Sequence, residues 1–119
     1  MSEPIAREIE DALSQGLEVS EELQSLMTKA RKASDFLKAL AHENRLVILC
    51  LLSERERSVT ELEGLLALGQ ATVSQQLARL RHEGLVTTRR DGRVIYYSLA
   101  DEATRLFIHA IYEKFCRDC

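Results

Sequence analysis

The sequence predicts a mainly α-helical domain with one small β-hairpin close to its carboxyl end. Three observations lead to this fold class. Apolar residues recur with helical spacing through most of the chain, a stretch rich in β-branched and aromatic residues surrounds Asp91-Gly92, and helical spacing resumes after Asp101. With 119 residues, 45% of them hydrophobic and 29% charged, the chain has the length and composition of one ordinary folded domain.

The first 19 residues are expected to form an acidic arm that is weakly helical or frayed. Apolar residues there lie near helical spacing, but Gly16 interrupts the pattern. Residues 1–26 contain seven acidic residues and one arginine, which gives a net charge of −6. From residue 20 to residue 41 the apolar spacing is sustained, so a long amphipathic helix is predicted to open the main domain, residues 20–119.

Two short helices are expected next. Residues 46–52 form an unbroken apolar run, so a helix over residues 43–53 would need to be buried on every side. Ser58 and Glu61 have the spacing of a capping box and open a further helix, which ends before Gly69.

A fourth helix is predicted from Gln70 to His82, where Val73, Leu77 and Leu80 share one inward face. Since only a short glycine-containing turn separates it from the helix before, the pair has the form of a helix-turn-helix.

A β-hairpin and a last helix complete the chain. Runs of β-prone residues at 85–90 and 93–99 flank Asp91-Gly92, the dipeptide favoured at the centre of a type I′ turn. Asp101 is expected to cap a helix that continues through Phe115. A hairpin directly after a helix-turn-helix predicts a winged helix-turn-helix, with the order helix, helix, helix, helix, hairpin, helix after the arm.

The outward face of the predicted fourth helix suits the major groove of DNA. Small alanines let the backbone approach closely, and glutamine and arginine side chains can bridge the donor and acceptor edges of bases. Arginines beside the hairpin tip are placed to meet phosphates or the minor groove. Although the whole chain has a net charge of −3, residues 70–98 have +3, from five arginines against two acids. The predicted DNA contacts are Gln70, Thr72, Ser74, Gln75, Arg79, Arg89, Arg90 and Arg93.

Other classes of function are less well supported by the sequence. The chain has no glycine-rich phosphate loop, nucleophile elbow or paired carboxylates, so neither an enzyme nor a cofactor is expected. A winged-helix module that only joins proteins is an alternative to a DNA-binding protein. Strong salt dependence of binding to DNA would distinguish the DNA-binding protein from this module. No stretch approaches the roughly 20 apolar residues that span a bilayer, and the amino terminus is acidic, so a cytoplasmic location without membrane contact is expected.

Residues from about 30 to 115 resemble the ArsR/SmtB family of winged-helix repressors. The resemblance implies a homodimer built on the first long helix and the last, which binds an imperfect palindrome in a promoter and releases it when an inducer acts. Gln76 stands where many members have a histidine, a departure expected to alter operator preference but not the fold. The resemblance rests on Ala39-Leu40-Ala41-His42-Glu43-Asn44-Arg45-Leu46, on QATVSQQLARL at residues 70–80, on Gly84-Leu85-Val86, and on Asp91-Gly92-Arg93 with Tyr96-Tyr97.

Two metal-ligand patterns of that family are missing from this chain. Residues 61–65 contain no thiol where a paired-cysteine motif would occur. In the last helix, the pattern that starts at Asp101 would need two histidines and an acid, where the chain has Ala103, Lys114 and Arg117. A zinc site of carboxylate and imidazole ligands is therefore not expected. Ordinary surface or packing roles are expected for His42, His82 and His109.

Three cysteines, Cys50, Cys116 and Cys119, are too few for a secreted disulfide scaffold. Judged by its apolar neighbours alone, Cys50 could be a small core residue. The chain also resembles a subgroup of the family, the persulfide- and sulfide-responsive SqrR/BigR type, whose two cysteines correspond to Cys50 and Cys116. By that analogy, reactive sulfur species would join these two thiols in a polysulfide bridge and release the DNA. The alternative is a three-thiolate site for arsenite or another thiophilic ion, formed by all three cysteines.

Overall fold

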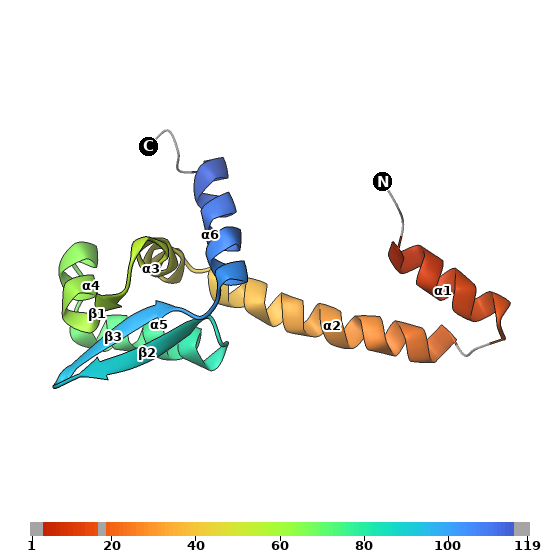
Figure 1. The fold of residues 1–119 in the computed structure, drawn as a ribbon, viewed down its shortest axis with the longest axis horizontal. Helices are drawn as coiled ribbons and strands as arrows, with labels where there is room; N and C mark the ends of the chain where they lie inside the picture. The colour runs from red at the N-terminus through yellow and green to blue at the C-terminus, as the bar shows by residue number, and fades with distance from the viewer. Residues whose placement is uncertain (1–3, 17–18, 116–119) are drawn as a thin grey trace. The chain divides into compact units, whose positions relative to one another are not determined.

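The computed structural model describes residues 4–16 and 19–115 (Figure 1). It divides into two compact units, residues 1–37 and residues 38–119, and each is described by itself. The first unit contains helix α1 (Pro4–Ser14) and most of helix α2 (Val19–Leu40). Gly16 has a φ of +76° and its N–H donates to the carbonyl of Leu13, the arrangement with which glycine commonly ends a helix. None of the described helices is long and apolar enough to cross a bilayer.

The second unit is the predicted winged helix-turn-helix. Its elements are α3 (Glu43–Glu54), β1 (Arg57–Ser58), α4 (Val59–Leu66), α5 (Gln70–His82), β2 (Val86–Asp91), β3 (Val94–Leu99) and α6 (Glu102–Phe115). Helix α3 contacts α5, β3 and α6, so it lies at the centre of this unit. The fold class predicted from the sequence is confirmed.

The core of the second unit forms around the inner side of α3. Ile48, Leu49 and Leu52 are fully buried there, and the predicted inward face of α5 is buried against them. The expectation that α3 is covered on every side is wrong, because Val47 is 46% exposed and Cys50 is only half-buried. The outer side of α3 therefore faces a groove.

The helix-turn-helix is formed by α4 and α5. The side chain of Ser58 caps α4 by accepting a hydrogen bond of 3.1 Å from the N–H of Glu61, as the capping-box spacing predicts. The left-handed residue of the turn is Ala67, with a φ of 55°, whereas Gly69 has an ordinary φ of −72° at the start of α5. The turn therefore places an alanine where glycine is usually favoured.

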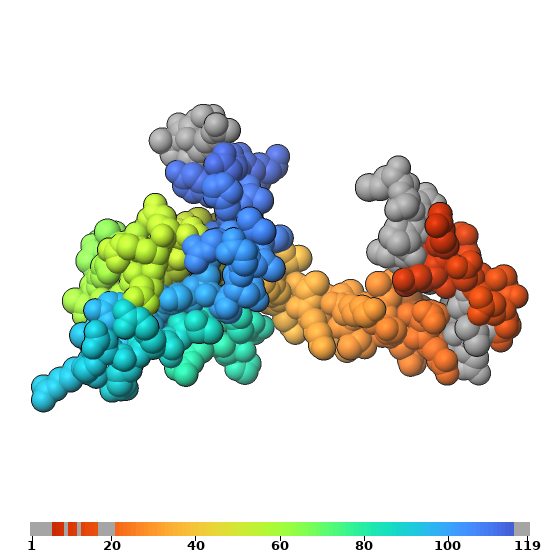
Figure 2. All heavy atoms as spheres, viewed as in Figure 1, coloured from red at the N-terminus to blue at the C-terminus, as the bar shows by residue number. Residues whose placement is uncertain are grey.

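The wing is an antiparallel sheet of three strands in the order β1-β3-β2. The two-residue strand β1 was not predicted. The turn also differs from the prediction, since Asp91 pairs with Val94 and the two central residues are Gly92 and Arg93. Only Gly92 has a positive φ, +65°, which is the pattern of a type II′ turn and not of the expected type I′ turn. Figure 2 shows this turn projecting beyond the rest of the second unit.

Helix α6 is capped as predicted, because the Asp101 carboxylate accepts a hydrogen bond of 2.7 Å from the N–H of Thr104. The same hydrogen bond is the largest cause of the lowered pKa of Asp101. Arg105 then donates to the carbonyl of Ser53, which joins α6 to the end of α3. This contact positions α6 along α3, the helix that contains Cys50.

Candidate nucleic-acid interface and cysteine groove

The outward face of α5 is exposed as the helical pattern predicts. Val73, Leu77 and Leu80 have no exposed surface, so the opposite side of the helix must face solvent. This side presents short and polar side chains along the whole helix. Its exposed members are Gln70, Ala71, Ser74, Gln75, Ala78 and Arg79, and Thr72 at its border is half-buried.

Arg79 is partly engaged within its own helix. Its guanidinium lies 3.5 Å from the carboxylate of Glu83, one turn along, while nearly half of the arginine side chain stays exposed. An exposed pair of this kind is weak, so Arg79 can exchange Glu83 for another hydrogen-bonding partner at little cost.

Gln76 does not belong to the outward face. Its side-chain oxygen accepts a hydrogen bond of 3.0 Å from Arg45 of α3. The same guanidinium donates to the carbonyls of Ala39 and Lys38 in the last turn of α2. This link was not predicted, because no local sequence pattern connects residues that lie 31 positions apart. Any effect of Gln76 on operator preference would therefore be indirect.

The three wing arginines differ in what they contact. Arg89 forms a bidentate ion pair with Glu56, and its guanidinium lies 4.5 Å from the centre of the Tyr96 ring. Arg90 and Arg93 are exposed, and neither forms an ion pair with any of the residues that the structure describes. The hairpin therefore presents two cations to solvent and holds a third against its own sheet.

A buried arginine joins the helix-turn-helix to α3. Arg57 of β1 donates to the carbonyl of Leu51 at 3.0 Å and pairs with Glu54 and Glu61 at 2.7 and 2.8 Å. Burial raises the pKa of Glu61, but hydrogen bonds from Arg55 and Arg57 outweigh it, so the pKa lies below its ordinary value. Because every polar group of this cluster has a partner, we assign it to the scaffold and not to the DNA-facing surface.

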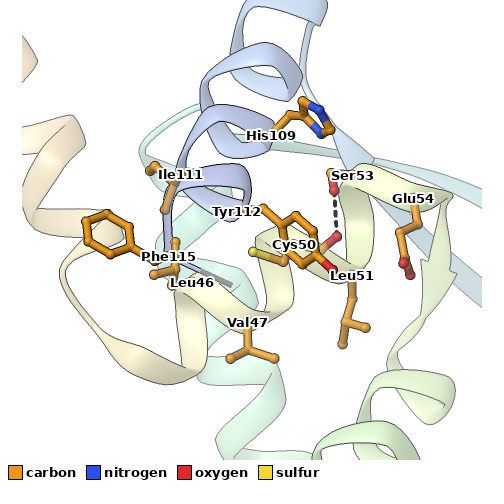
Figure 3. A pocket seen from close by; sticks show the side chains of 10 residues that line it. All are labelled: Leu46, Val47, Cys50, Leu51, Ser53, Glu54, His109, Ile111, Tyr112 and Phe115. Atoms are coloured by element: carbon orange, nitrogen blue, oxygen red, sulfur yellow. Dashed lines mark hydrogen bonds between the residues drawn. The ribbon is translucent and has the colours of Figure 1, made fainter. Parts of the chain in front are cut away.

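Cys50 lies in an apolar groove between α3 and α6, of about 570 Å³ (Figure 3). The backbone carbonyl of Cys50 accepts a hydrogen bond of 2.6 Å from the hydroxyl of Ser53, and the side chain of Cys50 lines the groove. The groove is lined by Leu46, Val47, Cys50, Leu51, Ser53 and Glu54 of α3 and by His109, Ile111, Tyr112 and Phe115 of α6.

Cys116, the second predicted sensing residue, and Cys119, which belongs only to the alternative three-thiolate site, lie outside the described residues. In the sequence, Cys116 is bonded directly to Phe115, a residue of the groove wall. Within residues 4–16 and 19–115, no three side chains of histidine, cysteine, aspartate or glutamate come together as a metal site.

The three histidines lie in different places. His42 precedes α3, and its Nδ1 is buried without a hydrogen-bonding partner among the described residues. His82 is exposed at the end of α5, and His109 lies 3.5 Å from the Glu113 carboxylate on α6.

Known proteins are similar to this chain in sequence and in fold. Residues 42–88 match the family model for the bacterial regulatory protein, arsR family. The biofilm growth-associated repressor of Agrobacterium fabrum is 41% identical over 108 residues, which cover 90% of this chain and 92% of the relative. The transcriptional activator HlyU of Vibrio cholerae is 40% identical over 95 residues, 80% of this chain and 88% of the relative.

Solved structures give the same result. Reduced HlyU from Vibrio cholerae superimposes with a TM-score of 0.74 at 39% identity, over 79% of this chain and 99% of that one. The transcriptional repressor BigR from Xylella fastidiosa superimposes with a TM-score of 0.70 at 39% identity, over 80% of this chain and 94% of that one. The homodimeric winged helix-turn-helix domain of Mb0332 from Mycobacterium bovis superimposes with a TM-score of 0.70 at 31% identity, over 74% of this chain and 82% of that one. The chain belongs to the ArsR family of bacterial regulatory proteins and is a DNA-binding transcriptional regulator.

Proposed function

We propose that the chain is a repressor that binds a palindromic operator as a homodimer and is released by reactive sulfur species acting on Cys50 and Cys116. The observation that carries the DNA-binding part is the division of α5 into a fully buried apolar face and an exposed face of short and polar side chains. In this proposal Gln70, Thr72, Ser74, Gln75 and Arg79 enter the major groove, and Arg90 and Arg93 approach the backbone beside it.

The homodimer is supported by apolar surface on α2 and α6. Large apolar side chains are exposed on each of these two helices, and burial of apolar surface drives most protein association. A homodimeric relative of this fold supports the same assembly. A twofold dimer would present two copies of α5 to the two halves of a palindrome. The exposed apolar residues are Leu23, Met27 and Leu37 on α2, and Leu106, Phe107, Tyr112 and Phe115 on α6.

The thiol part is supported by the position of Cys50 in the groove and by the sequence that follows α6. Phe115 lines the same groove as Cys50, and Cys116 is the next residue of the chain. A direct disulfide requires Cα atoms about 4.4–6.8 Å apart, whereas each inserted sulfur atom lengthens the bridge. The proposed product is therefore a polysulfide bridge between Cys50 and Cys116, of which a trisulfide is the shortest form.

The chemistry balances with two equivalents of an organic persulfide, RSSH. Each transfers one sulfur atom to Cys50 and leaves as RSH, so that Cys50 gains two sulfur atoms in a row. The Cys116 thiolate then attacks the first added sulfur, the bond between the two added sulfurs breaks, and the terminal sulfur leaves as hydrosulfide. The two protein thiols are oxidised, and one transferred sulfur is reduced to sulfide.

DNA binding is tested by fluorescence anisotropy with a labelled duplex that the protein selects from a random-sequence pool. The Gln75→Ala and Arg79→Ala variants should each bind about 5- to 150-fold more weakly, the loss expected for one base contact of about 1–3 kcal/mol. Arg81→Ala removes a charge from another exposed position of α5 and serves as the matched control. Equal affinities for all four proteins would contradict the assignment of this face.

The thiol mechanism is tested by peptide mass spectrometry after separate treatment with a persulfide donor, hydrogen peroxide and arsenite. A Cys50–Cys116 link with added sulfur should form with the persulfide donor only. DNA release should disappear in Cys50→Ser and in Cys116→Ser and persist in the control, Cys119→Ser. A retained arsenic mass would instead favour the three-thiolate site. Since one relative is an activator, a promoter reporter should determine whether the bound protein represses transcription.

A further inference from the structure

Arg89 belongs to the wing, but its side chain is directed back across the sheet. Its Nε lies 3.0 and 2.8 Å from the two carboxylate oxygens of Glu56, and its Nη2 also donates to Glu56. The guanidinium lies 4.5 Å from the centre of the Tyr96 ring, within the range of a cation–π contact. The group that would meet a phosphate is thus occupied on two sides.

Two of the three side chains come from strands of the wing, and the third comes from the residue before β1. Arg89 of β2 is paired with Tyr96 of the central strand β3, and Tyr96 is paired with Ser58 of β1. Glu56 immediately precedes β1. The arginine of one edge strand therefore passes over the central tyrosine and ends on a carboxylate beside the other edge strand.

This cluster lies on the side of the sheet that faces away from the core. Val86 and Leu99 form a buried pair on the core-facing side of the sheet. Because successive side chains of a strand point to opposite faces, Arg89 and Tyr96 project from the other face. Ser98, on the same face as Tyr96, also hydrogen-bonds Glu56 and helps to lower its pKa, although the largest cause is the hydrogen bond from Arg89. The pair is thus ionised at neutral pH.

We propose that Glu56, Tyr96 and Arg89 form a clasp that fixes the wing to β1, and that Arg89 is a positioning residue while Arg90 and Arg93 meet the DNA backbone. This inference rests on the proposed DNA-binding function. It assigns different roles to three neighbouring arginines that the sequence does not distinguish. Fixing the hairpin before binding lowers the cost of ordering it on the DNA.

The competing reading is that a phosphate displaces Glu56 and that Arg89 then contacts DNA directly. The side chains of Arg89 and Glu56 are 53% and 34% exposed, so a phosphate could reach them. The two readings predict opposite effects for Glu56→Gln, since loss of a clasp weakens DNA binding and loss of a competitor strengthens it.

The experiment measures the affinity of the full chain for the selected duplex over a range of salt concentrations. Each lost phosphate contact lowers the slope of log K against log salt concentration by about 0.9. We expect Arg93→Ala to lower the slope by this amount. We expect Arg89→Ala and Glu56→Gln to bind about 2- to 30-fold more weakly with the slope of the wild type.

A charge exchange gives the sharpest comparison. In the variant with both Glu56→Arg and Arg89→Glu the pair is reversed, so the clasp reading predicts tighter binding than with Arg89→Glu alone. Stronger binding by Glu56→Gln, a lower slope for Arg89→Ala, or no recovery in the exchanged variant would each overturn the proposal.

The rate of hydrogen exchange at the backbone amides of β2 and β3, measured without DNA, tests the clasp independently of DNA binding. Faster exchange in β2 and β3, larger in Arg89→Ala than in Glu56→Gln and absent in Arg93→Ala, is the expected result. Unchanged exchange would refute the clasp even if the DNA assays were uninformative. If the wild-type chain selected no duplex while the exchange pattern appeared as expected, the proposed function would fail and the clasp would stand as a structural contact only.

Discussion

Arg45 is expected to hold the end of α2 and the recognition helix α5 against the start of α3. Its Nε donates to the Ala39 carbonyl at 2.6 Å, its Nη2 to the Lys38 carbonyl at 3.3 Å, and its Nη1 to the Gln76 side chain at 3.0 Å. The two carbonyls lie in the last turn of α2, where backbone acceptors have no partner within the helix. Arg45 of α3 thus binds two further helices, α2 and α5.

The cost of breaking this link follows from its hydrogen bonds. A hydrogen bond to a charged group contributes about 1.5–3 kcal/mol, and the lower end applies because both side chains are half-buried and water can replace a lost partner. Gln76→Ala should therefore lower the free energy of unfolding by about 1.5 kcal/mol. Arg45→Ala should lower it by about 3 kcal/mol, because it removes the bonds to Gln76 and Ala39, whereas the Lys38 carbonyl keeps a hydrogen bond from the N–H of Ala41. At about 4 °C per kcal/mol, the melting temperature should fall by roughly 6 and 12 °C.

Urea unfolding followed by circular dichroism, at one protomer concentration, measures both values and their coupling. Combining Arg45→Ala with Gln76→Ala should cost little more than Arg45→Ala alone, a coupling of about 1.5 kcal/mol. Gln75→Ala, an exposed neighbour on α5, is the control and should change the stability by less than about 0.5 kcal/mol. Additive losses, with a coupling below about 0.5 kcal/mol, would refute the link.

Three further predictions concern stability. Leu62→Ala should cost about 2–5 kcal/mol because Leu62 is fully buried, whereas Leu65→Ala in the same helix, where the side chain is 54% exposed, should cost far less. Ala67→Gly should stabilise the fold by about 0.5–1 kcal/mol, since the left-handed backbone favours glycine, and a lower urea midpoint would contradict this. The pKa of Glu61 in the folded protein lies below its ordinary value of 4.5, so its stabilising contribution is complete above that pH and is lost as the pH falls through the lower folded value. An unfolding series from pH 7 to pH 3 should therefore show a smaller loss for Glu61→Gln than for the wild type, and equal losses would contradict the argument.

The features that depend on local periodicity were predictable from the sequence. Val73, Leu77 and Leu80 recur on one helical face, and all three are fully buried in the structure. The caps at Ser58 and Asp101 were also predictable, because the residue that caps a helix and the N–H that it binds lie only three positions apart.

The remaining features depend on contacts between distant residues or on short segments. Strand β1 has two residues, too few for an alternating pattern. The Arg45–Gln76 link and the Arg89–Glu56 pair join residues 31 and 33 positions apart. The shift of the hairpin turn by one residue is decided by the pairing of whole strands, which Asp91-Gly92 does not specify by itself.

One side of α3 is close-packed and the other borders a groove, so a group added to this helix can be accommodated on the groove side only. Ile48, Leu49 and Leu52 are packed without exposed surface, and a close-packed interior has little capacity to be compressed. The side with Cys50 borders open space toward α6. A group attached to the Cys50 thiol should therefore displace α6 and leave the helix-turn-helix nearly unchanged. In the proposed homodimer, a chemical signal at this cysteine would then change the distance between the two DNA-binding units and not the shape of either.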